Sequence, residues 1–322
     1  MASKPDETRD GVDLTSLNSP LFDGADATKR DLVEYLDAVR DKMLPVLTDR
    51  PLSVVRIRPG QEAFMQKNLP KYTPDFVARL PVWAEASKRE ISYGLCNDRK
   101  TLLWFANQRA VEFHVTLMRN NDWTLVDYLV LDLDPPPGSG EFGLAVQAAH
   151  LVQEALDQLG LQGAVKTSGS KGVHVYVPVA AAPEDAAAAT RAIAQRAADI
   201  DPALATTEFV VENRKGRVFI DSTRAGGATV VAAYSPRIRP GTPVSFPLDW
   251  SELDNVTPRD FTVKTAADML GDRDPWAAYL TEPQPLSEDL LSAGHAIPVA
   301  RVQAMHEGKR RKAQARAAQP RD

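Results

Sequence analysis

The sequence contains little cysteine and no long apolar run. One cysteine, Cys96, occurs in 322 residues, which excludes an intramolecular disulfide and any cysteine-rich zinc site. No stretch reaches the ~20 uncharged apolar residues that a membrane span needs, and the charged N-terminus lacks the apolar core of a secretory signal. We therefore expect a cytoplasmic protein in a reducing compartment, with no membrane partner.

Several catalytic motifs are also missing. The sequence has no His-Glu-x-x-His or Cys-x-x-Cys pattern, so zinc chemistry is unsupported. It has no Gly-x-Ser-x-Gly elbow of the serine hydrolases. The Gly-x-x-x-x-Gly-Lys-Ser/Thr spacing of a P-loop is absent too. Any chemistry must therefore come from other constellations of residues.

The composition is that of a soluble globular protein, with 43% hydrophobic and 25% charged residues. The net charge of −5 is unevenly distributed. Residues 308–322 hold six basic residues and one aspartate, a net charge of +5, which leaves −10 for residues 1–307. Such a basic tail either contacts a phosphate polymer or is a solvated terminus, and composition leaves both interpretations open.

The order of the expected elements favours an α+β architecture, because strands and helices do not alternate strictly. We expect a flexible segment at 1–25, a single two-lobed domain at 26–307 and the basic tail at 308–322. Thr28 is a typical helix N-cap, since apolar residues at helical spacing follow it. Residues 59–86 form a stretch broken by prolines, and 208–213 pairs with 217–221 in an expected hairpin. Further strands are expected at 52–58, 91–95, 111–118, 128–134, 164–167, 173–177 and 228–233, and helices at 99–108, 142–159, 183–198 and 264–270.

Two aspartates close one expected strand in the run Leu131-Asp132-Leu133-Asp134-Pro135. Residues i and i+2 of a strand point to the same face, so Asp132 and Asp134 stand side by side. Carboxylates this close repel one another unless a cation lies between them or one is protonated. Mg²⁺ or Mn²⁺ binds such carboxylates together with substrate phosphates. The alternative is that both aspartates only begin a proline-rich turn.

A third aspartate, Asp221, ends the apolar run Arg217-Val218-Phe219-Ile220. Three aspartates at strand ends can hold two metal ions, and a two-metal clamp suits in-line displacement at phosphorus. Taken alone, Asp221 is more often a residue that begins a turn.

A Ser/Gly turn lies in the run Lys166-Thr167-Ser168-Gly169-Ser170-Lys171-Gly172-Val173-His174. Such a turn can present backbone amides, hydroxyls and Lys171 to phosphate oxygens. His174 follows the turn on a strand, where it is placed to touch a triphosphate. A structural histidine is the alternative, both for His174 and for His114.

In this order, the three motifs resemble the archaeo-eukaryotic primase superfamily, and more closely the polymerase domain of bacterial DNA ligase D. The resemblance runs from about Leu14 to about Leu253 and includes the run Tyr234-Ser235-Pro236-Arg237. It implies two α+β lobes around a cleft, with a catalytic lobe similar to an RNA-recognition motif.

The resemblance also implies roles for individual residues. Asp132, Asp134 and Asp221 would be the catalytic residues and the ligands of two Mn²⁺ or Mg²⁺ ions. The incoming nucleotide would be held by His114, Ser168, Lys171, His174, Arg224 and Arg237. Arg224 lies in a segment one residue shorter than the ligase D pattern, where it would replace a polar contact.

On the DNA side, Lys29 stands where the family has a lysine that binds a 5′-phosphate, whereas Ser19 replaces a second such lysine. Phe64 and Met65 stand where the family often has two phenylalanines that stack on template bases. Lys67 is expected to contact DNA beside them. These departures indicate a stand-alone branch such as the primase-polymerases associated with ligase C.

The implied reaction is template-directed nucleotidyl transfer that fills short gaps in DNA, with ribonucleotides preferred. The expected partners are gapped or primed DNA, nucleoside triphosphates, an ATP-dependent DNA ligase and an end-binding protein, and the chain is expected to be a monomer. Non-homologous end joining and base excision repair are the candidate pathways. Two alternatives remain open: a metal-dependent phosphodiesterase or nuclease, and a non-catalytic module that binds DNA ends.

Overall fold

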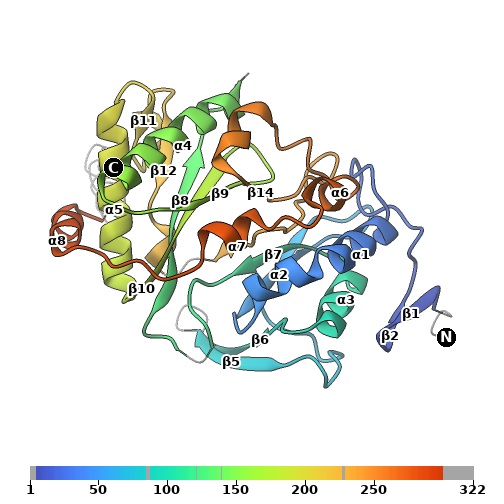
Figure 1. Cartoon of the computed structure of the whole chain (residues 1–322). Coiled ribbons are helices and arrows are strands. Elements are labelled where there is room, and N and C mark those ends of the chain that lie inside the picture. The colour runs from blue at the N-terminus through green and yellow to red at the C-terminus, as the bar shows by residue number, and fades with distance from the viewer. Residues whose placement is uncertain (1–4, 85–87, 121, 139, 227–228, 300–322) are drawn as a thin grey trace, which may run out of the picture.

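The computed structural model describes residues 5–84, 88–120, 122–138, 140–226 and 229–299. Two six-stranded sheets, a two-stranded sheet and a set of flanking helices make up this part of the chain (Figure 1). Its strands are β1 Glu7–Arg9, β2 Val12–Leu14, β3 Leu52–Arg56, β4 Phe64–Gln66, β5 Arg79–Ala84, β6 Arg89–Gly94, β7 Ala110–Val115, β8 Val126–Asp134, β9 Ala164–Thr167, β10 Val173–Ala181, β11 Ala205–Thr206, β12 Val218–Asp221, β13 Val230–Val231 and β14 Pro247–Leu248. Its α-helices are α1 Lys29–Ala38, α2 Arg40–Leu47, α3 Arg99–Asn107, α4 Glu141–Gln158, α5 Pro183–Ile200, α6 Ala266–Leu270, α7 Pro275–Tyr279 and α8 Glu288–Ala296.

The first sheet has the strand order β13-β7-β3-β6-β5, with β4 paired to β3. Helices α1, α2 and α3 pack together beside it (Figure 1). Helix α1 begins at the expected N-cap, because the Thr28 side chain accepts a hydrogen bond from the Asp31 amide and the Asp31 carboxylate accepts from the Thr28 amide. Its apolar stripe, which includes Leu32 and Leu36, is fully buried.

The second sheet has the order β11-β12-β8-β10-β9-β14. Its two long central strands, β8 and β10, are rich in Val and Leu and pair antiparallel. Helices α4 and α5 pack on each other and on this sheet (Figure 1). Small buried residues such as Ala186 and Ala189 allow α5 to approach closely. This Val/Leu-rich core gives the aspartates at the strand ends a rigid support.

The segment between β13 and β14 joins the two sheets. β13 pairs with β7 of the first sheet, and β14 pairs with β9 of the second. The Tyr35 hydroxyl of α1 donates to the Tyr234 carbonyl oxygen over 2.8 Å, which anchors the segment from the other side. Side chains from both sheets can therefore meet at one cleft.

The α+β class is confirmed, whereas several local predictions differ from the structure. The hairpin of 208–213 with 217–221 is wrong: β12 pairs with β8 and in parallel with β11, and 211–213 form a 3-10 helix. The proline-broken stretch 59–86 contains β4 and β5, because β pairing overrides its weak pattern. Residues 5–25 contain the β1–β2 hairpin and bury Leu14, Leu17 and Leu21. The basic tail, 308–322, lies outside the described residues.

No helix in the described ranges is long and apolar enough to cross a membrane.

Candidate active site

Three aspartates lie close together at the ends of two neighbouring strands of the second sheet. Asp132 and Asp134 lie at the end of β8, and Asp221 ends β12 directly opposite Asp132 in the antiparallel pairing. Burial, together with the charges of Asp132 and Asp221, raises the pKa of Asp134 to about 6. The strand ends thus bring together the three carboxylates that the sequence singles out. We call Asp132, Asp134 and Asp221 the acid cluster.

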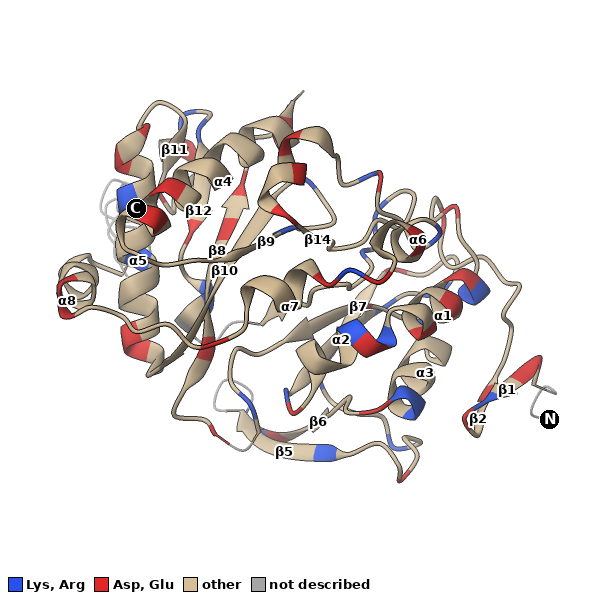
Figure 2. Cartoon of the chain, viewed as in Figure 1, with Lys and Arg blue, Asp and Glu red and all other residues tan. Residues whose placement is uncertain are grey.

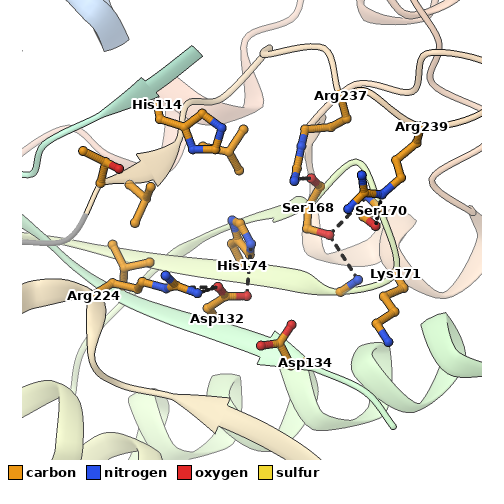
Figure 3. Close-up of a pocket in the computed structure, with 15 residues that line it drawn as sticks. His114, Asp132, Asp134, Ser168, Ser170, Lys171, His174, Arg224, Arg237 and Arg239 are labelled. Carbon is orange, nitrogen blue, oxygen red and sulfur yellow. Dashed lines mark hydrogen bonds and ion pairs between the residues drawn. The ribbon is translucent and has the colours of Figure 1, made fainter. Parts of the chain in front are cut away.

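Arg224 lies against the acid cluster (Figure 3). It belongs to the 3-10 helix η2, Arg224–Gly226, three residues beyond Asp221. Its guanidinium donates to Asp132 Oδ2 over 2.9 and 3.2 Å and lies 3.3 Å from Asp221 Oδ2. Although burial opposes ionisation, His174 and Arg224 together hold the pKa of Asp132 well below its usual range.

His174 connects the acid cluster to a buried lysine that the sequence analysis did not assign. His174 Nε2 lies 3.1 Å from Asp132 Oδ1, and its Nδ1 lies 2.8 Å from Lys166 Nζ. Lys166 is fully buried and also donates to Ser245 Oγ over 2.6 Å. Burial and the nearby Lys166 lower the pKa of His174 to about 4, so the imidazole is neutral at pH 7. Lys166 pairs with His174 in the β9–β10 register, which the sequence alone does not give.

The Ser/Gly turn lies on the opposite side of the cleft (Figure 3). Ser168 Oγ accepts from the amides of Ser170 and Gly172 over 3.2 and 3.1 Å, which fixes the turn. Gly169 has a φ of +67°, and a Cβ there would lie 2.6 Å from the Arg237 side chain, so the position requires glycine. Arg237 Nη1 donates to the Ser168 carbonyl oxygen. Two cations, Lys171 and Arg237, therefore lie beside the turn.

Glu112 organises the part of the cleft that the first sheet contributes. It lies two residues before His114 on β7, and its Oε2 is 2.9 Å from His114 Nε2. Its Oε1 accepts from the Ile238 amide over 2.9 Å and lies 3.3 Å from Arg237 Nε. Burial opposes ionisation, but the hydrogen bond to His114 and the Arg237 charge lower the pKa of Glu112 to about 2. Glu112 was not predicted, although two-residue spacing on a strand places it on the face of His114.

Most of these residues line one cleft, whose cavity volume is about 270 Å³. The cleft takes His114 from the first sheet and Asp132, Asp134 and His174 from the second. Ser168, Lys171, Arg224 and Arg237 also line it, with Ser170 and Arg239 added to the predicted set. Asp221 joins them through its contact with Arg224.

The acid cluster offers only hard oxygen donors, the set that Mg²⁺ and Mn²⁺ prefer. Burial, together with the nearby charges of Asp132 and Asp221, raises the pKa of Asp134, and a shared cation would relieve the repulsion between these carboxylates. Yet among the described residues no group of three or more His, Cys, Asp or Glu side chains is arranged to hold a metal ion. The Asp132 and Asp221 carboxylates contact Arg224 instead. The oxygen donors of the acid cluster thus suit Mg²⁺ or Mn²⁺, while Arg224 contacts two of the three carboxylates.

The predicted DNA-binding residues lie outside the cleft lining. Phe64 on β4 is 45% exposed, and the Arg56 guanidinium carbon lies 5.7 Å from the centre of its ring. Arg56 also donates to the hydroxyl of Tyr72, which is 59% exposed, over 3.3 Å. Lys67 is exposed just beyond β4. The structure therefore places Tyr72, an exposed ring that was not predicted, near Phe64 through their shared contact with Arg56.

Lys29 is buried, and its Nζ donates to the Thr15 carbonyl oxygen and to Asn107 Oδ1, both over 2.6 Å. Burial and the charge of Arg109 lower the pKa of Lys29 to about 8. The Arg109 guanidinium donates to Ser19 Oγ and to the Pro20 and Leu21 carbonyl oxygens. The Arg109 guanidinium therefore lies beside Ser19, although Arg109 is distant from Ser19 in the sequence. Arg109 has a left-handed backbone, with a φ of +59°, and no sequence pattern predicts its contact with Ser19.

An acid cluster and a Ser/Gly turn with adjacent cations at a cleft between two α+β lobes are consistent with a primase-polymerase type of nucleotidyltransferase. Comparison with known proteins agrees: residues 28–276 match the family described as LigD, primase-polymerase domain. The chain belongs to this family, whose domain is a polymerase that transfers nucleotides.

Relatives and a solved structure support the assignment. The chain is 36% identical over 266 residues to the bifunctional non-homologous end joining protein LigD of Bacillus subtilis, covering 80% of this chain and 42% of that protein. It is 30% identical over 293 residues to the multifunctional LigD of Mycolicibacterium smegmatis, covering 89% and 38%. The chain thus spans less than half the length of these relatives. The polymerase domain of Mycobacterium tuberculosis ligase D, solved in complex with DNA, superposes with a TM-score of 0.72 at 30% identity, covering 80% of this chain and 94% of that one.

Proposed function

We propose that the chain is a DNA-repair polymerase that fills short gaps by template-directed transfer of nucleotides, with ribonucleotides preferred. The observation that carries the proposal is the cleft itself, which Asp132 and Asp134 of the acid cluster line together with Ser168, Lys171 and Arg237. Anionic oxygens on one side and phosphate-binding groups on the other suit a nucleoside triphosphate bound with divalent cations.

In this mechanism Lys171, Arg237 and the amides of the Ser/Gly turn bind the triphosphate oxygens, and His114 lies at the opposite wall of the cleft. Neutral His174 holds Asp132 by its Nε2 and keeps that carboxylate ionised. Asp132, Asp134 and Asp221 would hold Mn²⁺ or Mg²⁺, which supplies activation of the primer 3′-hydroxyl and charge neutralisation at the phosphates. The new bond forms between the 3′-oxygen and the α-phosphorus, and pyrophosphate leaves.

The DNA is bound by residues of the first sheet and of the segments next to it. Phe64 stacks on a template base, and Lys67 contacts the backbone. Lys29 and Arg109 form the pocket for the 5′-phosphate across the gap, since the two cations are close enough for the Arg109 charge to lower the pKa of Lys29, although the Asp6 charge opposes that shift. Arg109 thereby supplies the positive charge that Ser19 lacks.

The proposed partners are gapped or primed DNA and nucleoside triphosphates, with an ATP-dependent ligase to seal the product and an end-binding protein to hold the ends. The DNA complex of the related mycobacterial domain supports the first of these. We propose that the chain acts as a monomer in the cytoplasm.

The test is incubation of a labelled gapped duplex, with or without a 5′-phosphate, with Mn²⁺ or Mg²⁺ and each nucleotide type. The proposal predicts a longer primer, one pyrophosphate per nucleotide added, and faster extension with ribonucleotides. A shortened primer would identify a nuclease instead, and binding without any change in length would identify a non-catalytic end-binding module.

A further inference from the structure

Arg224 is the cation that directly contacts two members of the acid cluster. Its guanidinium donates two hydrogen bonds to Asp132 Oδ2 and lies 3.3 Å from Asp221 Oδ2. The carboxylates of Asp132 and Asp221 are largely buried, whereas the Arg224 side chain is one-third exposed. One planar cation thus satisfies acceptors from both β8 and β12.

The backbone that carries Arg224 is firmly packed, because η2 lies against α5 and β8. The side chain is long and opens into the cleft, where Arg224 is one of the lining residues. The guanidinium can therefore leave the carboxylates by rotation of the side chain alone. Two positions of the side chain, one on the acid cluster and one in the cleft, need no change in the fold.

We propose that Arg224 is the built-in counter-ion of the acid cluster, and that a divalent cation reaches Asp132 and Asp221 by displacing its guanidinium. The inference rests on the proposed function, because it concerns the same carboxylates. Competition of this kind weakens metal binding when nucleotide is absent. Once displaced, the guanidinium is free in a cleft that we assign to a triphosphate, so metal and nucleotide binding reinforce one another.

The experiment measures Mn²⁺ binding to the full chain without DNA or nucleotide, by electron paramagnetic resonance of free Mn²⁺. Arg224→Gln removes the cation and keeps hydrogen-bonding capacity, and Arg224→Lys keeps the charge without the planar fork. Arg273→Gln is the matched control, since Arg273 pairs with Asp249 and Glu252 at the surface, 3.4 and 2.8 Å away. Asp132→Asn reports whether the measured ion binds at the acid cluster.

We expect Arg224→Gln to bind Mn²⁺ about tenfold more tightly than the wild type, Arg224→Lys to fall between them, and Arg273→Gln to match the wild type. Arg224→Gln should also lower the melting temperature in EDTA and show a larger rise when Mn²⁺ is added, because Mn²⁺ replaces the missing charge. Circular dichroism confirms that each variant is folded.

Equal or weaker Mn²⁺ affinity in folded Arg224→Gln would overturn the inference, since the guanidinium would then not compete. Loss of the tenfold gain in Asp132→Asn/Arg224→Gln would place the competition at the acid cluster, as expected, whereas its persistence would contradict that location. These readouts need no catalysis. A wild-type chain that fails to extend primers while Arg224→Gln gains affinity would reject the polymerase proposal alone.

Discussion

The cleft and the proposed DNA-binding surface use charge in opposite ways. In the cleft, Asp132, Lys166 and His174 are buried and bonded to one another, so their protonation states are fixed by neighbours in a low-dielectric setting. Around β4, Phe64 and Tyr72 are exposed and contact Arg56. Acidic and basic residues occur on the elements of both sheets (Figure 2). Chemistry at phosphorus needs preorganised charges, whereas contact with varied DNA sequences needs accessible rings and screened surface cations. The comparison predicts that mutations in the cleft stop the reaction, and that mutations on the DNA surface weaken binding.

The largest effect is expected from Asp132→Asn. The substitution keeps the shape of the side chain but removes the charge that His174, Arg224 and the cations contact, so nucleotide incorporation should fall by at least ~10³-fold. Rapid-quench incorporation on a gapped duplex measures the effect. DNA affinity, measured by fluorescence anisotropy, should change less than about twofold. Incorporation at the wild-type rate by this folded variant would remove the acid cluster from the mechanism.

Glu112→Gln tests a cleft residue that positions others. The change removes the charge that pairs with Arg237 and His114, and a charge-assisted contact of this kind is worth about 2 kcal/mol. We expect the KM for the nucleotide to rise by roughly 30-fold, with a small change in kcat. Glu252→Gln, which breaks a surface pair with Arg273, is the control and should leave both parameters unchanged. An unchanged KM in Glu112→Gln would confine Glu112 to a structural role.

Phe64→Ala tests the proposed DNA-binding surface around β4. Loss of one stacking ring should weaken binding of gapped DNA by about tenfold, at the lower end of the stacking energy per base. The kcat at saturating DNA should stay within about twofold of the wild type. Met269→Ala is the control, because Met269 is equally exposed, at 45%, on α6. If kcat falls as far as affinity, the separation between cleft and DNA surface breaks down.

The smallest effect is expected from pH at the 5′-phosphate pocket. The pKa of Lys29 is about 8, so its charge is present below pH 8 and is lost as the pH rises through that value. The preference for a 5′-phosphate over a 5′-hydroxyl should therefore fall by about threefold between pH 7 and pH 9. Lys29→Met should show a flat profile and a weaker preference throughout. A preference that rises with pH would contradict a phosphate site at Lys29.

The parts of the site that the sequence predicts are those with local signals. Alternation places Asp132 and Asp134 on one face, and the Ser/Gly turn is visible because its backbone needs glycine at Gly169. Lys166 was not predicted, because its contact with His174 depends on strand pairing. Arg109 was not predicted either, because it reaches Ser19 from a position 90 residues away along the chain. The same holds for the fold: strong strands such as β8 were predicted, whereas β5 is formed by pairing with β6 along its whole length.

The central claim is that the acid cluster holds the cations that bridge the triphosphate. The most direct test is a crystal of the chain with Mn²⁺ and a non-hydrolysable ribonucleoside triphosphate, in which anomalous scattering locates the manganese. The account predicts manganese bonded to carboxylate oxygens of Asp132, Asp134 and Asp221 and to phosphate oxygens of the nucleotide. Manganese bound elsewhere, with nucleotide in the cleft and Asp132 still bonded to Arg224, would contradict it.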